Sequence, residues 1–92
     1  MPIINAGIQI VPINITDPNY TIINAAINHI RQSGLTYIIT PFETVVNGSS
    51  EQVLQLIATL KQLSEENGAD ELIFNIRIHS KAGTDNPFEN KL

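Results

Sequence analysis

The stretch LTYIITPFETVVN, residues 35–47, decides the fold of this chain. It holds two short runs rich in β-branched residues, Leu35 to Thr40 and Glu43 to Asn47, joined by Pro41-Phe42. Such runs favour strands, and so short a connection predicts that the two strands pair antiparallel. A hairpin therefore lies in the middle of the chain, and the segments before and after it must supply the rest of the sheet and its cover.

A helix is predicted before the hairpin, at about residues 18–33. Asp17-Pro18 is typical of a helix start, because Asp17 can accept a bond from a first-turn N–H and Pro18 has its φ already set. Gly34 can adopt the left-handed conformation that ends such a helix. The predicted apolar stripe follows the spacing i, i+3, i+4, i+7 and consists of Ile23, Ala26, Ile27 and Ile30.

A second helix is predicted after the hairpin, at about residues 50–66. Ser49 and Gln52 match a capping box, in which the side chain of each residue accepts a hydrogen bond from the backbone N–H of the other. Asn67-Gly68 is a suitable stop. Its apolar stripe consists of Val53, Leu56, Ile57, Leu60 and Leu63.

Two outer strands complete the pattern, at residues 3–15 and 71–80. In the last strand Leu72, Phe74, Ile76 and Ile78 alternate with Ile73, Asn75, Arg77 and His79, so one face is expected under the helices. The order β-α-β-β-α-β predicts an α+β, ferredoxin-like sandwich: a four-stranded antiparallel sheet, in the order fourth, first, third, second, with two helices on one face. We expect one domain over residues 1–81 and a polar C-terminal tail over 82–92, ordered only if something holds it.

Composition excludes several classes of protein. The 92 residues contain no cysteine, which rules out disulfides, thiolate metal sites and a cysteine nucleophile. The net charge is −4 and the basic residues are dispersed, so nucleic acid is not an expected partner, whereas a cationic ligand meets a favourable field. No apolar run approaches the ~20 residues that span a bilayer, and the apolar N-terminus lacks the basic start of a signal peptide. A cytoplasmic protein with no membrane partner is predicted.

Residues arranged for catalysis are missing from the sequence. His29 and His79 have no second ligand at metal spacing, and neither a G-x-S-x-G motif nor a glycine-rich phosphate loop occurs. Acylphosphatases share the predicted topology, but the loop Asn14 to Asp17 has neither the glycines nor the arginine that their chemistry needs. We therefore expect no enzyme activity, no metal site and no cofactor.

The sheet face opposite the helices is the expected functional surface, since two helices cover only one side. The apolar residues there predict self-association through this face or the strand edge beside it, although Arg77 could instead cover them with its aliphatic stem. Glu43 is either a counter-charge for a cation or a solvated glutamate. The amides could read an aminopyrimidine edge or simply decorate the surface. The predicted residues of this face are Gly7, Gln9, Val11, Ile13, Ile38, Thr40, Glu43, Val45, Asn47, Ile73, Asn75, Arg77 and His79.

Four stretches, in order along the chain, resemble the small ferredoxin-like thiamine-binding proteins. They are IQIVP at 8–12, GLTY at 34–37 leading to Thr40-Pro41, ETVVNG at 43–48, and IRIHSKAG at 76–83. The resemblance implies a ferredoxin-like fold, dimers or tetramers formed through the sheets, and binding of thiamine or its hydroxymethyl-pyrimidine part. It implies no enzymatic activity. The family often has an acidic residue where Asn47 stands.

For such a ligand the expected binding residues are Gln9, Thr40, Phe42, Glu43, Thr44 and Asn75. Phe42 would stack on a ring or meet the cation, Glu43 would balance its charge, and the others would bind the pyrimidine edge. Tyr37 could also stack, but it and Thr44 are alternatively core residues. The other interpretation of the whole chain is a regulatory or assembly module of the same fold, which binds another small metabolite or only protein.

Overall fold

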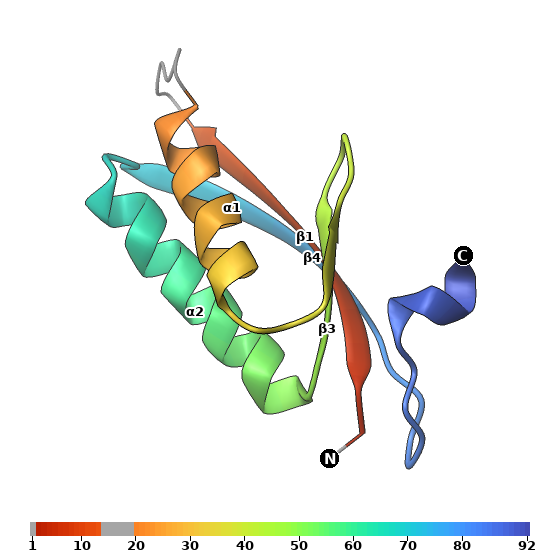
Figure 1. Cartoon of the computed structure of the whole chain (residues 1–92). Coiled ribbons are helices and arrows are strands. Elements are labelled where there is room, and N and C mark those ends of the chain that lie inside the picture. Colours follow the sequence, from red (N-terminus) through yellow and green to blue (C-terminus); the bar gives the residue numbers. More distant parts are fainter. Residues whose placement is uncertain (1, 14–19) are drawn as a thin grey trace.

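The computed structural model describes residues 2–13 and 20–92 and contains the predicted βαββαβ order. All strand pairs are antiparallel, and the spatial order β2-β3-β1-β4 confirms the predicted one. Both helices lie on one side of the sheet and the C-terminal segment lies on the other (Figure 1). The elements are β1 Ile4–Ile13, α1 Thr21–Gln32, β2 Tyr37–Ile39, β3 Thr44–Gly48, α2 Ser50–Glu66, β4 Glu71–His79 and the 3-10 helix η1 Phe88–Lys91.

The helix ends follow from local sequence. The capping box at α2 is confirmed: the Gln52 N–H donates to Ser49 Oγ at 3.2 Å, and the Ser49 N–H donates to Gln52 Oε1 at 2.9 Å. Gly34, just past α1, has the predicted positive φ of 82°, which glycine adopts without strain. In the described chain α1 begins at Thr21, and the predicted Asp17-Pro18 start lies outside the described residues.

The core lies between the helices and the sheet, but the predicted stripe on α1 is partly wrong. Ile22 is 1% exposed and is the helix's most buried residue, whereas Ile23 and Ile27 are only half-buried. Ile22, Ala26 and Ile30 are spaced i, i+4, i+8, so they point at the sheet together, and Ile23 and Ile27 fall beside that line. The core cluster is Ile4, Ala6, Ile8, Ala26, Ile30, Val46, Val53, Leu56 and Leu60.

The burial expected for β4 is also partly wrong. The register pairs Ile76 with Ile8 and Ile78 with Ala6, which places both on the helix side of the sheet. Their side chains are nevertheless 39% and 48% exposed. The reason is that β4 is an edge strand, and among the described elements only β1 packs closely against it. This end of β4 therefore presents apolar side chains to solvent.

The C-terminal segment packs against the sheet face opposite the helices. The Asn86 N–H donates to the Ile3 carbonyl at 2.8 Å, and the side chain of Asn5 donates to the Asn86 carbonyl at 2.8 Å. Asn47 accepts from the Phe88 N–H at 2.8 Å and donates to Glu89 Oε1 at 2.7 Å. These contacts hold the segment in place and bury Asn5 and Asn47. Asn47, expected on an open face, is therefore covered; the division of the chain at residue 81 stays a prediction.

Phe88→Ala should test how much this segment contributes. Phe88 is 7% exposed, and removing a buried phenylalanine side chain costs about 3 kcal/mol or more. We expect the free energy of unfolding in urea to fall by about that amount. Leu92→Ala is the matched control, because Leu92 is 85% exposed and should change little. Equal stabilities of the two variants would contradict the packing described.

Candidate functional site

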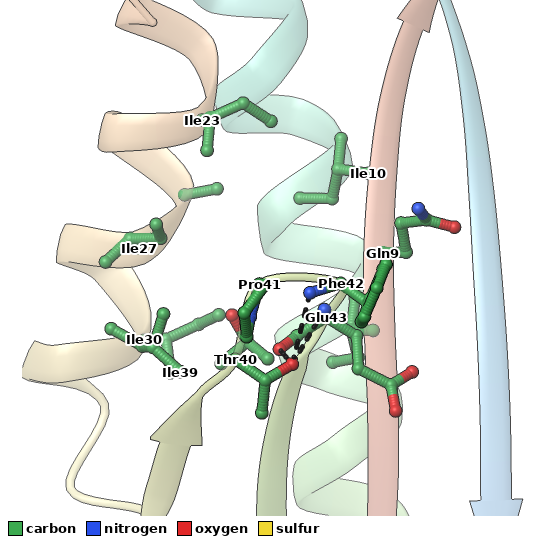
Figure 2. A pocket seen from close by; sticks show the side chains of 13 residues that line it. Gln9, Ile10, Ile23, Ile27, Ile30, Ile39, Thr40, Pro41, Phe42 and Glu43 are labelled. Atoms are coloured by element: carbon green, nitrogen blue, oxygen red, sulfur yellow. Dashed lines mark hydrogen bonds between the residues drawn. The ribbon is translucent and has the colours of Figure 1, made fainter.

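The turn between β2 and β3 is built around the hydroxyl of Thr40. This hydroxyl donates to the Glu43 carbonyl at 2.7 Å and accepts from the N–H groups of Glu43 and Phe42 at 3.0 and 3.3 Å. The Thr40 N–H also donates to the Glu43 carbonyl at 3.0 Å. Figure 2 shows the hydroxyl at the centre of the turn. Because its single proton is already used, Thr40 positions Phe42 and Glu43 rather than offering a donor to a ligand.

An apolar cavity lies beside this turn, between α1 and the sheet. Its volume is about 260 Å³. Isoleucines from α1 and β1 form its walls, and the turn closes one end (Figure 2). We call it the isoleucine cavity. It is lined by Ile8, Gln9, Ile10, Ile23, Ala26, Ile27, Ile30, Ile39, Thr40, Pro41, Phe42, Glu43 and Thr44.

The sheet lacks a strand beside this cavity. The pairing of β1 with β3 ends at Ile8 and Thr44, whereas the pairing of β1 with β4 continues to Ile13. Within the described chain, the hairpin side of β1 thus has no strand partner from Gln9 onward. Backbone groups along an unpaired strand edge can bond to a ligand. We call this feature the notch.

A second, more polar hollow of about 440 Å³ lies beyond the notch. Gln9 and Glu43 line both this hollow and the isoleucine cavity. Figure 2 shows that Ile10 points from β1 toward α1, whereas Gln9 and Glu43 point to the other side. We call the hollow the open-face hollow. It is lined by Gln9, Glu43, Phe74, Asn75, Ile76 and Arg77.

The carboxylate of Glu43 lies directly over Gly7 of β1. A Cβ atom at position 7 would be 2.5 Å from Glu43 Oε2 and 2.7 Å from its Cδ, so only glycine lets the carboxylate rest against the backbone. Among the described residues no cation or donor pairs with this half-buried carboxylate. A carboxylate partly removed from water and unpaired favours a cationic partner.

The structure brings the sequence-predicted residues together in two groups. Gln9, Thr40, Phe42, Glu43 and Thr44 line the isoleucine cavity, and Asn75 lies in the adjoining hollow. The Asn75 amide donates to Gln9 Oε1 at 3.0 Å. This bond orients the Gln9 amide and leaves its NH₂ group available.

Burial places two residues for which the sequence left a core role open. Tyr37 packs against the core, as does Ile10, and Thr44 is 8% exposed. Sequence reasoning missed Gly7 as a support for Glu43, and it put Ile23 and Ile27 in one apolar stripe with Ala26 and Ile30 without separating cavity wall from core. Ile23 and Ile27 differ from the core residues of α1 only because they lie beside the buried face of the helix. Which residues form that face depends on how the helix is rotated.

The described residues contain neither a metal-binding cluster nor a membrane-spanning helix. In residues 2–13 and 20–92, three or more histidine or acidic side chains do not gather where they could share a metal ion. In those ranges no helix is both long and apolar enough to pass through a bilayer.

Thr40→Val should loosen the turn, because valine keeps the shape of threonine and removes every bond of the hydroxyl. Loss of a partly buried hydrogen-bonding group costs about 1–2 kcal/mol, and we expect that fall in the free energy of unfolding. Thr36→Val is the control, since Thr36 is exposed and its side chain makes no bond to the described residues. An unchanged free energy of unfolding in Thr40→Val would mean that the turn does not depend on this hydroxyl.

Known proteins resemble this chain over most of its length. A family model described as thiamine-binding protein matches residues 6–92. A UPF0045 protein from Clostridium perfringens is 25% identical over 79 residues, which cover 86% of this chain and 83% of that protein.

Solved structures show the same fold. A domain of unknown function from Bacillus cereus superposes with a TM-score of 0.91 at 26% identity, over 99% of this chain and 88% of that one. A candidate thiamine biosynthesis/salvage protein from Thermotoga maritima superposes with a TM-score of 0.84 at 27% identity, over 97% of this chain and 95% of that one.

Proposed function

Because the chain belongs to the thiamine-binding protein family, we propose that it binds thiamine, or the hydroxymethyl-pyrimidine part of thiamine, and does not catalyse a reaction. The unpaired Glu43 carboxylate at the junction of the two cavities carries this proposal. Thiamine joins an aminopyrimidine to a permanently cationic ring, and the site joins an apolar cavity to a carboxylate.

The isoleucine cavity suits the aminopyrimidine ring. Ligand cavities commonly measure about 300 to 1,000 Å³, and at about 260 Å³ this one accepts a single ring rather than the whole vitamin. The isoleucines meet the faces of the ring. The amide of Gln9 points to the open face (Figure 2), so its free NH₂ group meets the part of the ligand that extends there. Phe42, which is 81% exposed at the cavity mouth, can close over the ring at the cost of a side-chain rotation.

The notch then lets the cationic ring pass from the cavity to Glu43. A cation over this carboxylate pairs it without displacing an existing partner, because the described chain supplies none. Among the described residues, the two cavities are lined by no histidine, serine or lysine. Glu43 is the lining side chain that could carry a proton, and we assign it the role of counter-charge. Binding without chemistry is the function that such a lining supports.

Glu43→Gln should weaken thiamine binding selectively. Loss of one partly exposed ion pair is worth up to about 1 kcal/mol, or roughly fivefold in Kd. An uncharged hydroxymethyl-aminopyrimidine should bind this variant as well as it binds the wild type. Isothermal titration calorimetry with both ligands makes the measurement, and Glu66→Gln, an exposed change on α2, is the control.

Two results would count against this assignment. If the wild type gave no heat or thermal shift with millimolar thiamine, the function itself would be wrong. If Glu43→Gln bound thiamine normally, the carboxylate would not be the counter-charge.

We also propose that copies of the chain associate through the edge of β4. In the described chain only β1 pairs with this nine-residue strand, so its outer backbone groups are free to pair. Ile73, Ile76 and Ile78 are 39% to 48% exposed along it.

Light scattering at micromolar concentration should therefore report a dimer or tetramer. Ile78→Lys places a charge in the proposed contact and should yield monomers. Ile38→Lys is the matched control, because Ile38 is 38% exposed on β2, at the opposite edge of the sheet from β4, and should leave the oligomer intact. A monomeric wild-type protein, or an oligomer that Ile78→Lys does not disturb, would exclude this interface.

A further inference from the structure

We propose that the site favours a phosphorylated form of its ligand, with Arg77 binding a phosphate ester on the hydroxyethyl arm of thiamine. The inference rests on the proposed function and specifies its ligand. It comes from the open-face hollow, where Glu43 and Arg77 are the charged lining residues. The Glu43 carboxylate is suited to bind a cation, and the Arg77 guanidinium is suited to bind an anion.

The two charges share a hollow without neutralising each other. Among the described residues, neither Glu43 nor Arg77 forms an ion pair. Gly7 separates them: it pairs with Arg77 of β4 on one side and with Val45 of β3 on the other, and the Glu43 carboxylate lies above it. Glu43 and Arg77 thus remain unpaired on either side of Gly7, which has no side chain to fill the space between them. Such an arrangement is complementary to a ligand that carries both a positive and a negative charge.

The spacing suits such a ligand. Neighbouring strands lie about 4.8 Å apart, so β3 and β4, which flank β1, are about 10 Å apart. A cationic ring held near Glu43 can reach across Gly7 with a two-carbon arm and place a phosphate near Arg77. The reverse orientation puts the phosphate against the Glu43 carboxylate, where like charges repel.

Arginine is well matched to this task, and the rest of the protein opposes a free anion. The guanidinium presents a planar fork of donors that fits phosphate oxygens, and the amides of Gln9 and Asn75 line the same hollow. The chain has a net charge of −4, which disfavours inorganic phosphate alone. The site should therefore select a phosphate that arrives attached to a cation.

Calorimetric titrations of the full chain with thiamine, thiamine monophosphate and inorganic phosphate test this. We expect the wild type to bind the monophosphate about three- to tenfold more tightly than thiamine at low salt, and the preference should shrink as salt screens the exposed pair. Arg77→Met should abolish the preference while keeping thiamine affinity. Arg77→Lys, which retains the charge but not the fork, should retain part of it.

The controls separate this inference from the function it rests on. Arg31→Met, an exposed change on α1 outside both cavities, should leave both affinities unchanged. Equal or weaker binding of the monophosphate by the wild type, or a preference that survives Arg77→Met, would overturn the role of Arg77 and leave thiamine binding intact. Absence of heat with both thiamine compounds would overturn the proposed function itself.

Discussion

A difference in strand length underlies the whole site. The turn built on the Thr40 hydroxyl ends the hairpin at Thr44, but β1 continues to Ile13 beside β4. The sheet is therefore complete at one end and lacks a strand at the other. The isoleucine cavity, the notch and the open-face hollow all lie at the incomplete end. A hairpin extended by two residues on each arm would pair with the free edge of β1 and fill the notch with backbone.

Gly7 contributes to the same site through the side chain that it lacks. In the middle of a strand a glycine weakens the sheet, and it commonly marks a place where another group approaches the backbone. Here that group is the Glu43 carboxylate. β1 therefore has no packing side chain at this position, and the Glu43 carboxylate lies close to the sheet backbone, between the apolar cavity and Arg77.

The opposite end of the sheet shows how the rest of the face is closed. Asn5 and Asn47 would be exposed there, but the segment around Phe88 covers them and bonds to them. Polar groups removed from water need such partners. The C-terminal segment therefore confines the open part of the face to the half that contains Gln9, Glu43, Asn75 and Arg77. The exposed edge of β4 is a separate surface, apolar where the face is polar.

Sequence by itself determined the order of elements, the strand order and the capping box at Ser49, because each depends on periodicity or on contacts a few residues apart. It also pointed to Gln9, Phe42 and Glu43 as binding residues, through the predicted open face of the sheet and the resemblance to the family. The rotation of α1, the bond network of Asn47 with residues 88 and 89, and the contact of Glu43 with Gly7 were decided by tertiary structure alone. These features depend on how whole elements pack against one another. The sequence pattern of one element does not specify where its neighbour lies.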